Sequence, residues 1–207
     1  MKRLFAMTAV VAMVACADVR IPGMGDGWET LIDGEKGLEN FDQVGDANWR
    51  AEGGAIVADK GKSGFLLTKK SYKDFEIRAE FYAESDTNSG IYIRCNSREK
   101  ISGSAGASCY EVNIWDTRPD PKFGTGAIVD VAAVAVPIQS KAGGHWNTYE
   151  VTAKGPRMTA KLNGVHTSSG EDARLPEGWV GLQFAAGGAN GAQGGPIKWR
   201  KVQIRPL

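Results

Sequence analysis

The run Tyr-Glu-Val-Asn-Ile-Trp-Asp at positions 110–116 alternates polar and apolar residues within one short segment. Successive side chains of an extended strand point to opposite faces, so Glu111, Asn113 and Trp115 share one face. An indole stacks on a sugar ring, an amide hydrogen-bonds hydroxyl groups, and a carboxylate takes or gives a proton. We therefore expect this face to bind a carbohydrate, with Glu111 as the catalytic base. An ordinary solvated strand face is the alternative, and Asp116 at the strand end is a further candidate for substrate binding.

Arg94 is the second candidate for a catalytic role, because a guanidinium beside Glu111 would keep this carboxylate ionised at neutral pH. Whether the two share a face depends on strand register. If Cys95 lies directly opposite Cys109, Arg94 and Glu111 point to opposite faces. A one-residue bulge or a diagonal disulfide would bring them together.

Two more polar residues are candidates for substrate binding, Gln183 within an apolar segment and Asn88 before a glycine. The segment 88–90 is equally compatible with a turn that leads into a strand. Hydrolysis by two carboxylates needs a second acid at a defined distance from the first. Asp116 and Asp120 are the nearest in sequence, and Asp116 points away from the Glu111 face. The sequence therefore does not support the two-carboxylate mechanism.

The N-terminus has the pattern of an export signal. Lys2 and Arg3 precede an apolar run, 4–15, that is too short to span a bilayer. The run ends before Cys16 in a sequence that resembles the bacterial lipobox, whose Cys is lipidated and becomes the new N-terminus. We expect a lipoprotein signal peptide at 1–15, a spacer at 16–27 after lipidated Cys16, and a single domain at 28–207. A plain secretory signal is the alternative.

The remaining cysteines indicate the cellular compartment, and the charge balance limits the kinds of partner to expect. In an oxidising compartment Cys95 and Cys109 predict one disulfide, with two separate buried thiols as the alternative. The chain has 25 Lys+Arg and 24 Asp+Glu, and this balance gives no reason to expect a nucleic-acid ligand. We expect a location in the bacterial cell envelope, in the periplasm or on the outer membrane, with the lipid as the membrane contact. The oligomeric state stays open.

Short apolar segments separated by Gly, Asn, Asp and Pro must position these residues. No segment of ten or more residues has a clean helical period, and Asn163-Gly164 is a strong hairpin signal. The pattern predicts an all-β sandwich of two antiparallel sheets. The expected strands are 28–32, 49–59 as a hairpin, 64–68, 74–83, 90–95, 109–115, 146–154, 157–162, 165–167, 179–185 and 197–205, with 127–136 either a strand or an irregular buried segment.

Several of these segments, in this order, resemble one family. They are WRAEGGAIV (49–57), DFEIRAEF (74–81), NSGIYIR (88–94), YEVNIWD (110–116), WNTYEVTAK (146–154), LNGV (162–165), GLQ (181–183) and IKWRKVQIR (197–205). Together they are similar to the 3-keto-disaccharide hydrolase-like family over roughly residues 28 to 206. The resemblance implies a concanavalin A-like jelly roll, activity toward 3-keto-glycosides, and export, often as a lipoprotein.

The sequence departs from the family pattern after GLQ, where many members have His-Gly and this chain has Phe184-Ala185. With only His145 and His166 elsewhere in the chain, an imidazole metal site is not expected. We identify no cofactor, and no spacing marks a calcium site, although folds of this kind often bind calcium at a rim. The expected function is cleavage of 3-keto-glycosides or 3-keto-disaccharides through elimination by one base. The alternative is a non-catalytic carbohydrate-binding or structural envelope lipoprotein.

Overall fold

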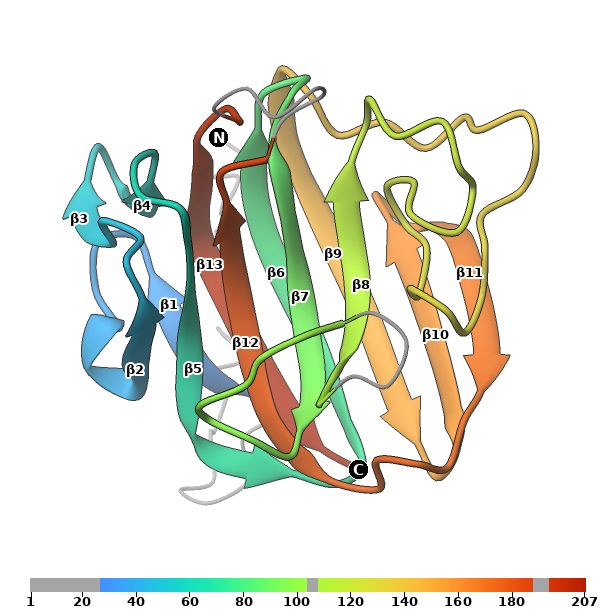
Figure 1. Cartoon of the computed structure of the whole chain (residues 1–207). Helices are drawn as coiled ribbons and strands as arrows, with labels where there is room; N and C mark the ends of the chain where they lie inside the picture. The colour runs from blue at the N-terminus through green and yellow to red at the C-terminus, as the bar shows by residue number, and fades with distance from the viewer. Residues whose placement is uncertain (1–26, 104–107, 188–193) are drawn as a thin grey trace, which may run out of the picture.

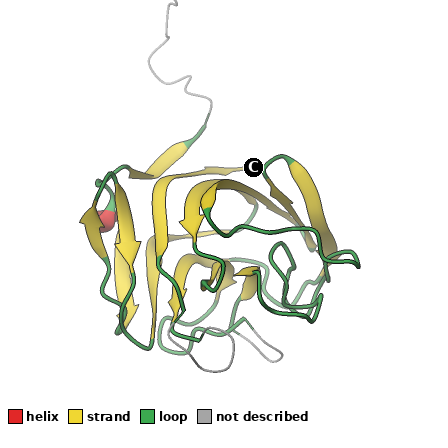
Figure 2. Ribbon diagram, turned by 90° about the horizontal axis from the view of Figure 1, so that it is seen from above, coloured by secondary structure: helices red, strands yellow, loops and turns green. Residues whose placement is uncertain are grey.

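The computed structural model describes residues 27–103, 108–187 and 194–207. The expected signal peptide, Cys16 and nearly all of the spacer lie outside the described residues. Two antiparallel sheets pack face to face, as Figures 1 and 2 show. The larger sheet has eight strands, in the order β11 (Val165–Glu171), β10 (Arg157–Leu162), β9 (His145–Lys154), β6 (Phe75–Ala83), β13 (Ile197–Pro206), β4 (Ala55–Ala58) and β3 (Arg50–Glu52), with β1 (Glu29–Asp33) paired to β13.

The smaller sheet has five strands and carries the polar residues singled out above. Their order is β2 (Phe41–Gly45), β5 (Ser63–Tyr72), β12 (Gly178–Ala185), β7 (Asn88–Cys95) and β8 (Tyr110–Trp115). A short 3-10 turn, η1 (Leu38–Asn40), precedes β2. The predicted all-β sandwich is therefore confirmed. Among the described residues, no helix is long and apolar enough to cross a membrane.

The hairpin between β10 and β11 shows how local sequence fixes these strands. Leu162 pairs with Val165 across the turn, and Asn163 and Gly164 both have positive φ, at 52° and 79°. A two-residue turn of this kind needs positive φ at both positions, which Asn-Gly adopts at low cost. The predicted segment 127–136 is not a strand, since only isolated bridges at Ile128 give it regular pairing.

The outer faces of the two sheets differ. Along β6 and β9 buried side chains alternate with partly exposed ones, as expected for a sheet with one face in solvent. Nearly every residue of β7 and β8 is buried. A second apolar cluster, separate from the main core, lies on the outer face of the five-stranded sheet and contributes to this burial; it contains Phe65, Leu67, Tyr92, Cys95 and Cys109, with Val44, Ile101 and Trp179 packed against it.

Candidate functional site

Glu111 lies on the outer face of β8, under the connection between β7 and β8. Its strand neighbours Tyr110, Val112 and Ile114 belong to the main core, in agreement with the predicted alternation. Tyr92 of β7 is directly opposite Glu111 in the register. Glu111 is only 9% exposed. The alternating pattern therefore places Glu111 on the outer face, and the tertiary structure buries it there.

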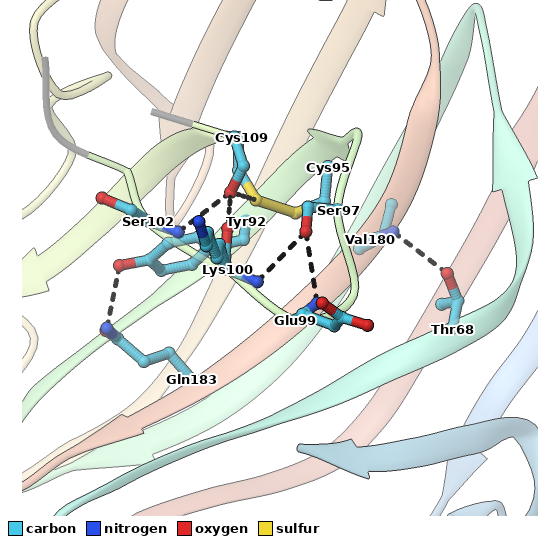
Figure 3. Close-up of a disulfide and its surroundings, with 11 residues drawn as sticks. Thr68, Tyr92, Cys95, Ser97, Glu99, Lys100, Ser102, Cys109, Val180 and Gln183 are labelled. Carbon is cyan, nitrogen blue, oxygen red and sulfur yellow. Dashed lines mark hydrogen bonds between the residues drawn. A yellow bond between two sulfur atoms is a disulfide. The ribbon is translucent and has the colours of Figure 1, made fainter. Parts of the chain in front are cut away.

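Tyr92 and Gln183 complete a polar cluster with Glu111, which we call the outer cluster. The Tyr92 hydroxyl donates a hydrogen bond to the Glu111 carboxylate and accepts one from Gln183 Nε2 at 2.8 Å. Figure 3 shows Gln183 pointing at the Tyr92 hydroxyl from the neighbouring strand. Gln183 Oε1 is buried and has no partner among the described residues. The cluster therefore retains an unsatisfied acceptor beside the carboxylate.

The segment 101–103 covers Glu111, and the disulfide closes the loop that contains it. Gly103 packs so closely that a Cβ there would lie 2.5 Å from the Glu111 Cβ. Cys95 and Cys109 form the predicted disulfide, with Cα atoms 4.2 Å apart, beside the Tyr92–Gln183 pair (Figure 3). The bridge joins the end of β7 to the start of β8, so it holds both ends of the cover near the outer cluster.

Burial controls the electrostatics of the outer cluster. Removal from water raises the pKa of the Glu111 carboxyl to about 7, and the negative charge of Asp130 adds to this effect. The hydrogen bond from Tyr92 acts in the opposite direction, because it stabilises the carboxylate. Burial and the Glu111 charge also raise the pKa of the Tyr92 hydroxyl, so this hydroxyl stays protonated. Glu111 is thus a carboxyl group that exchanges its proton near neutral pH.

Arg94 is not beside Glu111, and this corrects the predicted pairing. A bulge does occur on β7: Arg94 has φ 54°, and the register with β12 shifts between Tyr92 and Cys95. It turns the guanidinium inward, away from the outer face. There Arg94 pairs with Asp74 at 3.1 Å. The register places Tyr92 opposite Glu111, so regular alternation would bring Arg94 to the same face. The extra residue of the bulge turns Arg94 to the other side, so here a bulge separates the two residues.

The contacts of Arg94 are those of a residue that stabilises the fold. It is fully buried and donates to the carbonyl oxygens of Lys73 at 2.9 Å, Gly155 at 2.7 Å and Leu175 at 3.4 Å. Asp74 also accepts from the Gly155 backbone N–H. Arg94 therefore ties together three connections at one end of the sandwich.

Asn113 and Asp116 also hold backbone in place. The Asn113 side-chain amide donates to the Phe123 carbonyl at 2.5 Å and accepts from the Ile114 N–H. Asp116 accepts from the backbone N–H groups of Ala142 and Gly143 at 2.8–3.0 Å. These contacts support the loops beside β8, and a direct role of Asn113 and Asp116 in binding substrate stays a prediction.

Asn88 and Trp115 mark the other end of the outer face. They pair directly across β7 and β8, so Asn88 belongs to a strand and not to a turn. Asn88 Nδ2 donates to the Gly187 carbonyl at 3.3 Å. Trp115 is half-buried, and Arg118 lies over its ring at 4.9 Å. Both residues stay on the face that carries Glu111.

Tyr92, Asp130 and Gly103 also belong to the site, although the sequence did not predict them. Alternation places Tyr92 on the outer face, but only the register puts it opposite Glu111. Asp130 lies in a non-strand segment with φ 58°, and it also lines a hollow of about 170 Å³ with Lys122. In the part of the chain that the structure describes, no three His, Cys, Asp or Glu side chains gather in a metal-binding cluster.

The sequence and the structure are similar to those of known proteins. The chain is 27% identical to the 3-keto-disaccharide hydrolase of Bacteroides thetaiotaomicron over 181 residues, which is 74% of this chain. The match spans 60% of the length of that curated relative.

Solved structures agree on the architecture. A candidate glycosyl hydrolase from Parabacteroides distasonis superposes with a TM-score of 0.67 at 25% identity, over 87% of this chain and 99% of the other. A carbohydrate-binding module from Bacillus subtilis shares the fold alone, with a TM-score of 0.53 at 17% identity over 86% of this chain and 95% of the module. The family profile itself matches residues 27–205. The chain therefore belongs to the 3-keto-alpha-glucoside-1,2-lyase-like domain family.

Proposed function

We propose that this protein binds 3-keto-glycosides on the outer face of the five-stranded sheet and cleaves them by elimination, with Glu111 as the base. The observation that carries the proposal is the outer cluster. Glu111 is withdrawn from water beside the Tyr92 hydroxyl, which Gln183 holds by a hydrogen bond, and its pKa is about 7. A base is most effective when its pKa lies near the working pH. The relative from Bacteroides thetaiotaomicron is named for the same substrate class.

The reaction needs one base because the substrate ketone at C3 acidifies the proton on C2. Glu111 takes this proton, and the C–H electron pair forms the enolate. The enolate collapses to restore the ketone, a double bond forms between C1 and C2, and the bond from C1 to the leaving oxygen breaks. Glu111 returns its proton to that oxygen, and water then adds across the double bond. The net result is hydrolysis.

Tyr92 and Gln183 serve the enolate in this scheme. The Tyr92 hydroxyl stands next to the carboxylate and accepts from Gln183 Nε2, in a site that the 101–103 segment covers. Once Glu111 has taken the C2 proton, the Tyr92 O–H is released to donate to the enolate, and Gln183 holds that hydroxyl in position. Donors fixed in position at the site of developing charge stabilise a transition state without reorganising.

The test is turnover of a 3-keto-disaccharide in D₂O, followed by NMR. Elimination requires the C2 proton to leave, so the product should carry deuterium at C2. Direct hydrolysis at C1 leaves that proton in place and would contradict the mechanism. Glu111→Gln should lower kcat by a factor on the order of 10²–10⁴. Glu177→Gln, at an exposed loop position, is the matched control and should retain full turnover.

Carbohydrate binding without cleavage is the second candidate, favoured by the occupied side chains of Arg94 and Asn113 and by the absence of the family's histidine after Gln183. Calorimetry separates the two. Wild-type protein that binds a 3-keto-disaccharide and releases no product would support binding alone.

We also propose export, with lipidation of Cys16. The proposal is supported by the basic start, the short apolar run and the sequence before Cys16. Expression in a bacterial host with a radiolabelled fatty acid should label the wild-type chain, and Cys16→Ser should abolish both the label and membrane fractionation. Labelling of the Cys16→Ser chain would contradict it.

A further inference from the structure

Arg118 lies between two aromatic rings at the far end of the Glu111 face. Its guanidinium carbon is 4.9 Å from the Trp115 ring centroid and 5.1 Å from that of Phe123. Such contacts hold a cation by its attraction to the ring faces. Because the two rings restrict the side chain, a ligand that binds Arg118 has little conformational entropy to remove. We call these three residues the aromatic clamp.

The clamp leaves a charge without a counterion. Among the described residues no Asp or Glu forms an ion pair with Arg118, whereas most of the other described arginines have one. The two acids nearest in sequence have other partners: Asp116 accepts from Ala142 and Gly143, and Asp120 from the Lys122 N–H. Arg118 is thus available to an anion from outside the chain.

Arg118 also has an unused donor. Its Nε is buried and finds no acceptor in the described part of the chain, although a buried N–H without a partner costs free energy. Arg94 shows the contrast, because its guanidinium reaches three carbonyl oxygens and a carboxylate. The rings close off Nε, so a ligand reaches the terminal N–H groups, and a planar carboxylate that accepts from these would supply the counterion that Arg118 lacks.

The position of the clamp relates it to Glu111. Trp115 is four residues along β8 from Glu111, on the same face, which corresponds to roughly 13 Å of extended strand. Asn113 lies between them and donates to the Phe123 carbonyl, so Phe123 is fixed beside the same strand. The clamp and the base can therefore contact two linked sugar units of one ligand.

We propose that Arg118 binds a carboxylate on the second sugar unit, so that the preferred substrate is a 3-keto-glycoside of an acidic sugar such as a uronate. The assignment rests on the proposed function of Glu111 for the position of the first unit. A single guanidinium carries one positive charge, which matches a carboxylate better than a phosphate dianion.

The test compares three ligands: a neutral 3-keto-disaccharide, the same disaccharide with glucuronate as the second unit, and one with a 6-phosphate there. Calorimetry on the Glu111→Gln chain measures affinity without consuming the ligands. We expect the glucuronate ligand to bind at least tenfold more tightly than the neutral one, and this advantage to fall as salt is added. Arg118→Met should abolish the advantage and leave affinity for the neutral ligand unchanged.

Arg78→Met is the matched control. Arg78 stacks on Trp28 at 4.7 Å on the other sheet, so its loss should affect no ligand. Circular dichroism and thermal melting check that each variant is folded. Equal binding of the neutral and glucuronate ligands, an unchanged preference in Arg118→Met, or tightest binding of the phosphate would each overturn the proposal.

Failure of this inference is distinguishable from failure of the proposed function. Turnover of the neutral substrate with no acidic preference rejects the role of Arg118 and leaves the role of Glu111 intact. Tight, Arg118-dependent binding of glucuronate with no turnover rejects the elimination and keeps the acidic site. No binding of any of the three ligands counts against both.

Discussion

Strands β7 and β8 contribute to two buried polar clusters that differ in how well their groups are satisfied. One is the outer cluster of Tyr92, Glu111 and Gln183. The other, which we call the end network, contains Arg94 and Tyr110 with their partners Asp74 and Asp172. Tyr92 and Arg94 are only two residues apart in the sequence, but the bulge on β7 places their side chains on opposite sides of the sheet.

The end network is satisfied. Arg94 has four acceptors, and the Tyr110 hydroxyl donates to Asp172 and accepts from the Leu175 N–H at 3.0 Å. In the outer cluster Gln183 keeps an unpaired oxygen, and the pKa of Glu111 is raised to about 7. Complete pairing stabilises a fold, whereas a perturbed, incompletely paired group indicates a site that awaits a ligand. The difference separates structure from function within one pair of strands.

The largest expected effect tests the structural half of this comparison. Arg94→Met removes the guanidinium donor from three carbonyl oxygens and leaves Asp74 with only the Gly155 N–H, so we expect a loss of about 3–5 kcal/mol in the free energy of unfolding. Urea denaturation measures it. Arg94→Lys, which keeps the charge but not the planar donor set, should lose less. An unchanged denaturation midpoint in Arg94→Met would remove the distinction between the two clusters.

The second prediction concerns the pH dependence of stability. The pKa of Glu111 rises from its ordinary 4.5 to about 7 on folding, so the folded chain binds this proton more tightly than the unfolded chain. The associated stability is fully present below pH 4.5 and is lost as pH rises through 7, by about 3 kcal/mol. Glu111→Gln should remove this component. Unfolding curves of both chains between pH 4 and 8 measure it, and parallel pH profiles would contradict burial of the carboxyl group.

The cover over Glu111 gives the third prediction. Gly103→Ala places a methyl group against the Glu111 side chain, so we expect a loss of about 1–3 kcal/mol from overpacking and a displaced cover. Gly187→Ala is the matched control, because its Cβ meets only the Asn88 amide, at 3.5 Å. Thermal melts and turnover of both variants measure the effect. Equal behaviour of the two would mean that the contact at Gly103 is unimportant.

The smallest expected effects on stability and on the pH profile come from a matched pair of hydroxyl deletions, although the kcat of Tyr92→Phe should also fall because Tyr92 is the proposed donor to the enolate. Tyr92→Phe removes the hydrogen bond that favours the Glu111 carboxylate, so the pKa of Glu111 should rise and the pH–rate profile should move to higher pH by up to about one unit. Tyr110→Phe should cost about 1 kcal/mol of stability and leave the profile in place. Identical pH–rate profiles for the two variants would show that Tyr92 does not act on Glu111.

Most of the fold was predictable because its rules are local. Alternation identified the two faces of 110–116, turn residues at regular spacing identified 74–83 and 146–154 as strands, and the Asn163-Gly164 turn fixed one hairpin. Cys95 and Cys109 were paired correctly as the two that remain after Cys16. Each of these inferences depends on neighbouring residues in the sequence or on the number of cysteines. None of them requires knowledge of how the strands are arranged in space.

The contents of the outer cluster were decided by contacts between distant segments. Sequence alone selected Glu111 and Gln183, but the register of β7 against β8 supplied Tyr92, and the bulge at Arg94 reversed the expected partnership. The covering segment at 101–103 then set the burial that raises the pKa of Glu111. Residue types are written locally in the chain, whereas register, burial and the charge around a carboxyl group are properties of the whole fold.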